Sequence, residues 1–212
     1  MRGRNPFDMH QLRTWLDDLM AYLDAAHRGR DDLDAVRDAL GCEIVPAQPP
    51  VEAAGLPSAD AWLAEAVARA TSADARLAAI AQGIARLAPS LRWYRRPTEA
   101  PDAAFEHGHA NAIVIGGAGL ATLGGLIVGI SLMAPGVVYP VHRHPPDEVY
   151  VVLSDGQWWR DGAGWWTPGA GQLVLNDGGV LHSMRAGDAP LLTVWFLSGA
   201  TAGGVPGPLD EA

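Results

Sequence analysis

Hydrophobic and polar positions follow two different periods along the chain, and the change falls near residue 90. In the first part, apolar residues recur every three or four positions, as they do on one face of a helix. We therefore expect helices over residues 7–27, 31–40, 62–67 and 77–87. Ser58 and Ser72 stand before the last two of these segments, where they are predicted to act as N-caps.

After Pro89, short runs rich in Val, Ile, Leu and Trp alternate with Gly, Pro and Asp. Strands are expected over residues 91–94, 112–115, 126–133, 149–153, 157–160, 172–175 and 191–197. Strands at such intervals favour an antiparallel sandwich or barrel. The fold is thus predicted to be mainly β with an α-helical N-terminal extension. The extension spans residues 1–104, the barrel 105–199 and a loose tail 200–212, with residues 95–102 forming a polar link.

One long span without charged residues raises the question of whether the chain crosses a membrane. Residues 110–141 contain no charged side chain, which is long enough for a membrane helix. Six glycines interrupt the span before residue 135, however, and Pro135-Gly136 ends it. Buried strands are therefore predicted here, and no membrane association is expected.

Composition narrows the class of protein. The net charge of -9 argues against a nucleic-acid binder, which normally carries a basic face. Cys42 is the single cysteine, so the chain cannot form an internal disulfide. Acidic residues follow the N-terminal arginines in place of an apolar run, so no export signal is expected and the predicted location is cytoplasmic.

Candidate metal-binding residues lie close together in one short stretch, where His142 and His144 precede Glu148. His182 follows further along the chain. Residues two apart on a strand share a face, and Pro145-Pro146 should bend the chain so that Glu148 comes alongside the histidines. Burying these groups unpaired would cost several kcal/mol each. We therefore predict that all four bind one divalent transition metal. Imidazole and carboxylate ligands suit Fe(II), Mn, Zn, Ni or Co, and favour a catalytic over a structural site.

The spacing of these ligands resembles a known superfamily. Gly136, five residues, His142-x-His144, three residues and Glu148 resemble the first cupin motif. Gly179-x-x-His182 resembles the core of the second. The resemblance implies a cupin barrel, which is a double-stranded β-helix of the jelly-roll type.

Further residues resemble one family within the cupins. Tyr139 precedes the first histidine by three positions, and Tyr150 follows Glu148 by two. Together with residues 108–111 and 179–192, they are similar to the dimethylsulfoniopropionate (DMSP) lyases. The similarity covers roughly residues 105–199, and these lyases also carry a helical N-terminal half.

The resemblance implies a metal-dependent β-elimination that releases dimethyl sulfide and acrylate from DMSP. A tyrosine ordinarily titrates near 10, but a nearby dication favours its charged form. Tyr150 is the first candidate for the base, and Tyr139 is the second or positions the substrate carboxylate. The sulfonium group requires an aromatic face. Trp195 is the first candidate for that contact, and Trp159 is a second.

Two other functions remain open from the sequence. The same ligands with Fe(II) or Mn would suit a cupin dioxygenase or isomerase acting on another small carboxylate. A non-catalytic small-molecule-binding cupin is the third hypothesis. The expected partner is a small-molecule substrate, with a homodimer as a candidate assembly. His107 and His109 are expected on the rim of the pocket, away from the metal.

Overall fold

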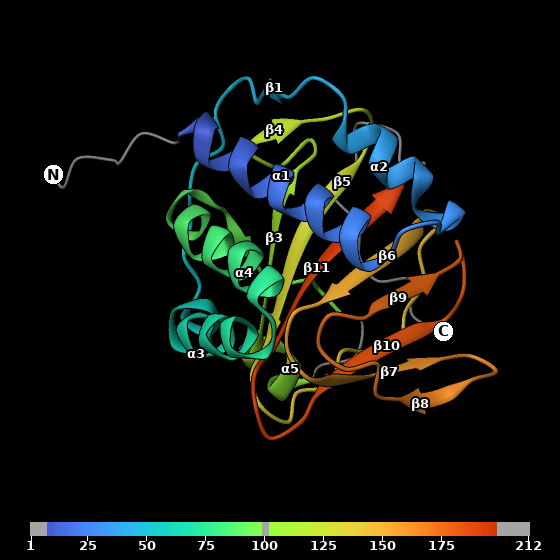
Figure 1. Cartoon of the computed structure of the whole chain (residues 1–212). Helices are drawn as coiled ribbons and strands as arrows, with labels where there is room; N and C mark the ends of the chain where they lie inside the picture. Colours follow the sequence, from blue (N-terminus) through green and yellow to red (C-terminus); the bar gives the residue numbers. More distant parts are fainter. Residues whose placement is uncertain (1–7, 99–101, 199–212) are drawn as a thin grey trace, which may run out of the picture.

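A large sheet runs through the molecule, with helices on one face and a small sheet facing the other (Figure 1). The structure is a computed structural model that describes residues 8–98 and 102–198. The expected tail, residues 200–212, lies outside the described residues. The helices that cover the sheet are α1 (Met9–Ala26), α2 (Asp34–Leu40), α3 (Pro57–Ala73) and α4 (Ala75–Leu87).

Each predicted helix is present, but both predicted N-caps are wrong. Helix α3 begins at Pro57, one residue before Ser58, and Pro is favoured in the first helical turn because its missing N–H needs no partner there. The Ser58 hydroxyl instead donates to the carbonyl of His109 at 2.8 Å. Ser72 lies inside α3, and Asp74 caps α4 by accepting a hydrogen bond from the Arg76 N–H.

The large sheet contains eight strands, of which β2 lies off the main path and pairs with β3. The path runs through β1 (Val45–Pro46), β4 (Ala121–Thr122), β3 (His109–Ile115), β5 (Ile127–Met133), β11 (Leu191–Ser198), β6 (Asp147–Val152) and β9 (Leu173–Asn176), and β2 spans Trp93–Tyr94. The small sheet comprises β10 (His182–Ala186), β7 (Gly156–Arg160) and β8 (Gly164–Trp166). Two facing sheets of this kind form a jelly roll, which confirms the predicted fold class.

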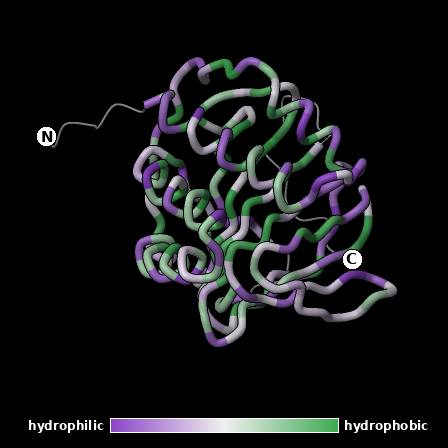
Figure 2. The backbone as a smooth tube through the Cα atoms, in the orientation of Figure 1, coloured by the Kyte–Doolittle hydropathy of each residue, from purple (hydrophilic) through white to green (hydrophobic). Residues whose placement is uncertain are grey.

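Residues of β11 show how the large sheet separates two cores. Val194 and Phe196 belong to the hydrophobic cluster beneath the helices. Trp195 and Leu197, which alternate with them, belong to the cluster between the two sheets. The tube of Figure 2 is coloured mostly hydrophobic along these central strands. Because alternate residues of a strand point to opposite faces, a strand buried on both sides reads as a continuous apolar run.

The uncharged span at residues 110–141 forms β3, β4 and β5, as predicted. Within the described residues, no helix is long and apolar enough to cross a membrane. Two short strands from the N-terminal part, β1 and β2, pair with β4 and β3 of the large sheet. The part of the chain before residue 104 therefore contributes strands to the sheet as well as helices.

Some elements were not predicted, and each lacks the pattern that would reveal it. Helix α5 (Ala103–Gly108) is only six residues long and begins after Asp102, whose carboxylate accepts two backbone hydrogen bonds. Strand β10 begins at His182 and includes Arg185, so it has no apolar run. Strand β8 is three residues long.

Candidate active site

The two histidine-bearing segments lie side by side. His142 and His182 exchange backbone hydrogen bonds of 3.0 and 2.9 Å, which aligns their segments in antiparallel fashion. After Pro145-Pro146 the chain enters β6 of the large sheet, which carries Glu148. Glu148 thus comes from the large sheet, His182 from the small sheet, and His142 and His144 from the segment before the proline bend.

The candidate metal centre contains three imidazoles. Ligand nitrogens of His142, His144 and His182 all lie within 4.8 Å of one another, and all three residues are largely buried. Each Nδ1 lies at hydrogen-bond distance from a backbone carbonyl: Pro140 at 2.8 Å, Pro146 at 3.0 Å and Val180 at 2.9 Å, respectively. Because a carbonyl only accepts, Nδ1 carries a proton, so Nε2 is the nitrogen that each imidazole can offer to a metal.

Glu148 completes the set of donors. Its Oε2 lies 3.2 Å from Nε2 of His144 and 3.0 Å from Nε2 of His182, and it accepts a hydrogen bond from Asn176 at 3.3 Å. Nε2 of His182 is buried, and within the described residues its contact with Glu148 lacks the geometry of a good hydrogen bond. A buried polar atom without a partner is costly, so this nitrogen is well suited to a metal. Three imidazoles beside a carboxylate fit a divalent transition metal.

The charges of the centre also suit a cation. Burial, and then the charge of His182, hold the pKa of His142 well below its usual value, so this imidazole stays neutral. Burial alone would raise the pKa of Glu148, but hydrogen bonds and charge from His144 and His182 hold it well below its usual value. A neutral imidazole and an ionised carboxylate are the protonation states that bind metals.

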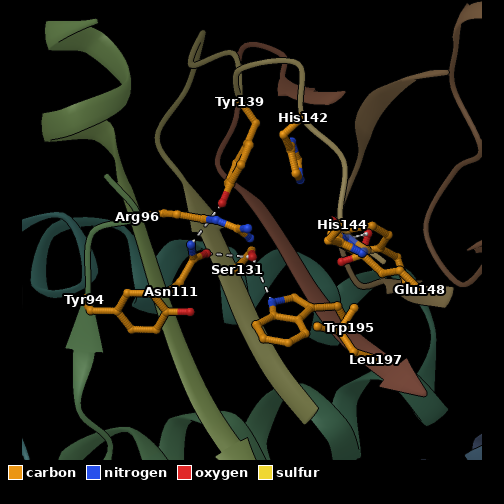
Figure 3. A pocket seen from close by; sticks show the side chains of 11 residues that line it. Tyr94, Arg96, Asn111, Ser131, Tyr139, His142, His144, Glu148, Trp195 and Leu197 are labelled. Carbon is orange, nitrogen blue, oxygen red and sulfur yellow. Dashed lines mark hydrogen bonds and ion pairs between the residues drawn. The ribbon is translucent and has the colours of Figure 1, made fainter. Parts of the chain in front are cut away.

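A narrow pocket opens beside the centre (Figure 3). Its free volume in this structure is only about 10 Å³, roughly the space of one water molecule. The residues that line it are Tyr94, Arg96, Asn111, Ser131, Tyr139, His142, His144, Glu148, Tyr150, Trp195 and Leu197. The pocket therefore gathers polar and aromatic side chains beside the three histidines.

A directed chain of hydrogen bonds crosses the pocket wall. The Trp195 indole N–H donates to Ser131 at 3.0 Å, and the Ser131 hydroxyl donates to the Asn111 carbonyl at 2.7 Å. The Asn111 amide then donates to the Tyr139 hydroxyl at 3.3 Å. Because the Tyr139 oxygen accepts at the end of this chain, its own proton is available to a ligand.

Both predicted tyrosines face the pocket, in different electrostatic surroundings. Burial raises the pKa of Tyr150 well above 10, and the charge and hydrogen bond of Glu148 raise it further. Burial also raises the pKa of Tyr139, but the charge of Arg96 and the hydrogen bond of Asn111 oppose this. Without a metal, both phenols are therefore protonated at neutral pH.

Comparison with known proteins assigns the chain to a family. The profile of the dimethylsulfoniopropionate lyases matches residues 47–193, well over half of the chain. The chain belongs to the dimethylsulfoniopropionate lyase family. No significant match is found among curated protein sequences.

Solved structures of DMSP lyases share the fold. A chain from the crystal structures of the DMSP lyases RdDddP and RnDddQII is 22% identical with a TM-score of 0.70, over 91% of this chain and 96% of that one. DMSP lyase DddQ from Ruegeria pomeroyi DSS-3 is 24% identical with a TM-score of 0.62, over 87% and 91%. A cupin-2 domain from Rhodospirillum rubrum also matches, at 18% identity and a TM-score of 0.43, over 57% and 78%.

The two tryptophans predicted to contact the substrate of the lyase lie in different places. Trp195 faces the pocket, where its indole is 5% exposed. Trp159 does not line the pocket: Trp158 occupies the interior face of β7, so its neighbour points outward. There Trp159 lies opposite Trp165 of β8. The prediction for Trp159 is wrong because the sequence does not reveal which face of β7 is buried.

Five residues of this lyase pocket were missed by the sequence analysis: Tyr94, Arg96, Asn111, Ser131 and Leu197. Arg96 belongs to the segment interpreted as a polar link. The expectation for His109 is also wrong, since this residue is fully buried instead of lying on the rim. His107 is exposed, on α5.

Gly129 makes room for the indole that faces the lyase pocket. It lies opposite Trp195 in the pairing of β5 with β11, and a Cβ added at Gly129 would come within 2.0 Å of Cζ2 of Trp195. The indole therefore lies directly over the backbone of β5, where its N–H reaches Ser131. Only glycine allows so close an approach.

We expect Gly129→Ala to displace the Trp195 indole and to break its hydrogen bond to Ser131. Overpacking of this kind typically costs about 1–3 kcal/mol of folding free energy. Lyase turnover should fall along with the free energy of unfolding, measured by urea denaturation. Gly117→Ala is the matched control, because an added Cβ there meets no atom within 4 Å. Unchanged tryptophan fluorescence and turnover in Gly129→Ala would contradict this role.

Proposed function

We propose that this protein cleaves dimethylsulfoniopropionate by β-elimination, releasing dimethyl sulfide and acrylate. The observation that carries the proposal is the position of the three-histidine centre, which shares a small pocket with two tyrosines and Trp195 in a member of the DMSP lyase family. In this reaction a base removes the proton from the carbon next to the carboxylate. The electron pair of that C–H bond forms the C=C bond, and the Cβ–S bond breaks, so the sulfur leaves as neutral dimethyl sulfide.

The metal ligands in this proposal are His142, His144, Glu148 and His182. Their support is the contact of Glu148 with two of the histidines and the approach of the three imidazoles to within 4.8 Å of one another. A bound divalent metal, with Fe(II), Mn, Zn, Ni and Co as the candidates, would stabilise the negative charge that develops as the proton leaves. Asn176 holds the carboxylate in place through its hydrogen bond.

Tyr150 is the proposed base, and Tyr139 assists it. Support for Tyr150 comes from its position on the same face of β6 as Glu148, inside the pocket. Tyr139 is proposed to donate its proton to the substrate carboxylate, because its oxygen already accepts from Asn111. The indole face of Trp195 is proposed to contact the sulfonium group through a cation–π interaction. A homodimeric assembly and a cytoplasmic location remain predictions.

Headspace gas chromatography of the metal-loaded protein mixed with DMSP tests this function. We expect dimethyl sulfide to accumulate at equal rates with and without oxygen, because an elimination consumes no oxidant. A dioxygenase would instead consume oxygen. Absence of dimethyl sulfide from protein with a full complement of metal would refute the proposal.

A further inference from the structure

Arg96 places a positive charge in the wall of the pocket, on the side away from the candidate metal ligand Glu148 (Figure 3). It follows β2, two residues after Tyr94, and its side chain extends between Tyr139 and Ser131. Burial raises the pKa of Tyr94 and of Tyr139, and the charge of Arg96 opposes this rise. The guanidinium therefore acts on the pocket interior even though it comes from the N-terminal part of the chain.

The backbone of Arg96 is held by a buried histidine. Nδ1 of His109 contacts the Phe105 carbonyl at 2.5 Å, so Nδ1 carries the proton and Nε2 accepts. The Arg96 N–H donates to this Nε2 at 2.9 Å. The His109 ring stacks on Phe105 with centroids 3.6 Å apart. Burial lowers the pKa of His109 to about 4, so the ring stays neutral and keeps accepting near pH 7.

The Arg96 guanidinium has N–H donors that are available to a ligand. In the described ranges, no carboxylate lies within ion-pair distance of Arg96, whereas Arg30, Arg37, Arg69 and Arg76 all form such pairs. Nε of Arg96 is buried and has no hydrogen-bond partner in the part of the chain that the structure describes. The Arg96 guanidinium has five N–H donors, and its hydrogen bond to the Tyr139 hydroxyl occupies only one of them. A partly desolvated cation with free donors is suited to an anionic ligand.

We propose that Arg96 binds the carboxylate of the substrate, with His109 as the positioning residue that fixes the backbone of Arg96. The proposal rests on the proposed function for the identity of the substrate. The Tyr139 hydroxyl lies beside the guanidinium, so the two groups can share one carboxylate. Arginine suits this task because its planar fork matches the two oxygens of a carboxylate.

This assignment also orients the substrate. A sulfonium group is cationic, so the charge of Arg96 repels it and excludes the reverse orientation. The carboxylate end then lies at Arg96 and Tyr139. Trp195, also in the pocket wall, offers its indole face to the sulfonium end. Arg96 thus selects for small zwitterions or anions over neutral compounds of the same size.

Comparing the affinities for acrylate and acrylamide shows whether Arg96 binds a carboxylate or has only a structural role. These two probes have nearly the same shape but differ in charge. We expect the metal-free full-length protein to bind acrylate at least about tenfold more tightly in titration calorimetry, because charge-assisted hydrogen bonds are the stronger ones. In Arg96→Met this preference should disappear. Arg95→Met is the matched control: Arg95 is exposed, does not line the pocket, and its replacement should leave the preference intact.

Turnover gives a second, independent measurement. In the metal-loaded protein, Arg96→Met should raise KM for DMSP by about 10- to 100-fold, the loss expected for hydrogen bonds to a charged group. Arg96→Lys, which keeps the charge without the fork, should fall between Arg96→Met and the wild type. If thermal melting shows that Arg96→Met is unfolded, Arg96→Gln is measured in its place.

Two results would overturn the proposal. One is a wild-type protein without preference for acrylate, or a folded Arg96 variant that keeps it. The other is a fall in kcat with unchanged KM and unchanged acrylate binding, which would assign Arg96 to holding Tyr139 alone. Failure of the proposed function gives a different result: no dimethyl sulfide forms, yet acrylate binding still depends on Arg96.

Discussion

Replacing His182 with alanine is expected to remove the metal and, with it, nearly all turnover. Its buried Nε2 lies 3.0 Å from the carboxylate of Glu148. Mutating a residue that merely supports a metal ligand typically costs 10- to 100-fold in affinity or activity. Loss of a ligand itself should therefore cost more than about 100-fold. Metal content after dialysis, measured by inductively coupled plasma mass spectrometry, and headspace dimethyl sulfide provide the two readouts.

The fold of His182→Ala should survive, because β10 pairs with the His142 segment through backbone atoms that alanine keeps. His107→Ala is the matched control, since His107 is exposed on α5 and lies outside the pocket. It should retain both metal and turnover. A His182→Ala protein that holds a full equivalent of metal would remove His182 from the ligand set.

The candidate metal centre could be predicted from the sequence because its determinants are local. Two histidines and a glutamate lie within seven residues, and strand geometry alone decides that His142 and His144 can act together. The bend at Pro145-Pro146 follows from the chemistry of proline. Only His182 is distant, and its short motif with Gly179 made it recognisable.

The opposite wall of the pocket could not be predicted, because strand pairing assembles it. Tyr94 lies opposite Asn111 in the pairing of β2 with β3, and Asn111 lies opposite Ser131 in the pairing of β3 with β5. These residues form a row across three strands that are far apart in sequence. No spacing within one segment reveals such a row, since the register of each pair is set by tertiary packing. Arg96 enters the pocket only because β2 joins this sheet.

Replacing Tyr150 with phenylalanine is the second change with a large expected effect, and it separates proton transfer from metal binding. The substitution removes only the hydroxyl, and the buried ring continues to pack against Trp158, 6.2 Å away between centroids. Metal content should not change, because Tyr150 is not among the proposed ligands. Turnover should fall by about 10²- to 10⁴-fold, the usual contribution of a positioned base.

The contrast with Tyr139→Phe decides which phenol takes the proton. A dication held by Glu148 would offset the charge that raises the pKa of Tyr150. The hydroxyl of Tyr139 instead ends the hydrogen-bond chain from Asn111, a role suited to positioning the substrate. We therefore expect Tyr139→Phe to raise KM more than it lowers kcat, and Tyr150→Phe to do the reverse. Tyr22→Phe is the control, because the Tyr22 hydroxyl donates to the Gly171 carbonyl outside the pocket. Near-normal turnover in Tyr150→Phe, with a large fall in kcat for Tyr139→Phe, would instead identify Tyr139 as the base and Tyr150 as the residue that positions the substrate.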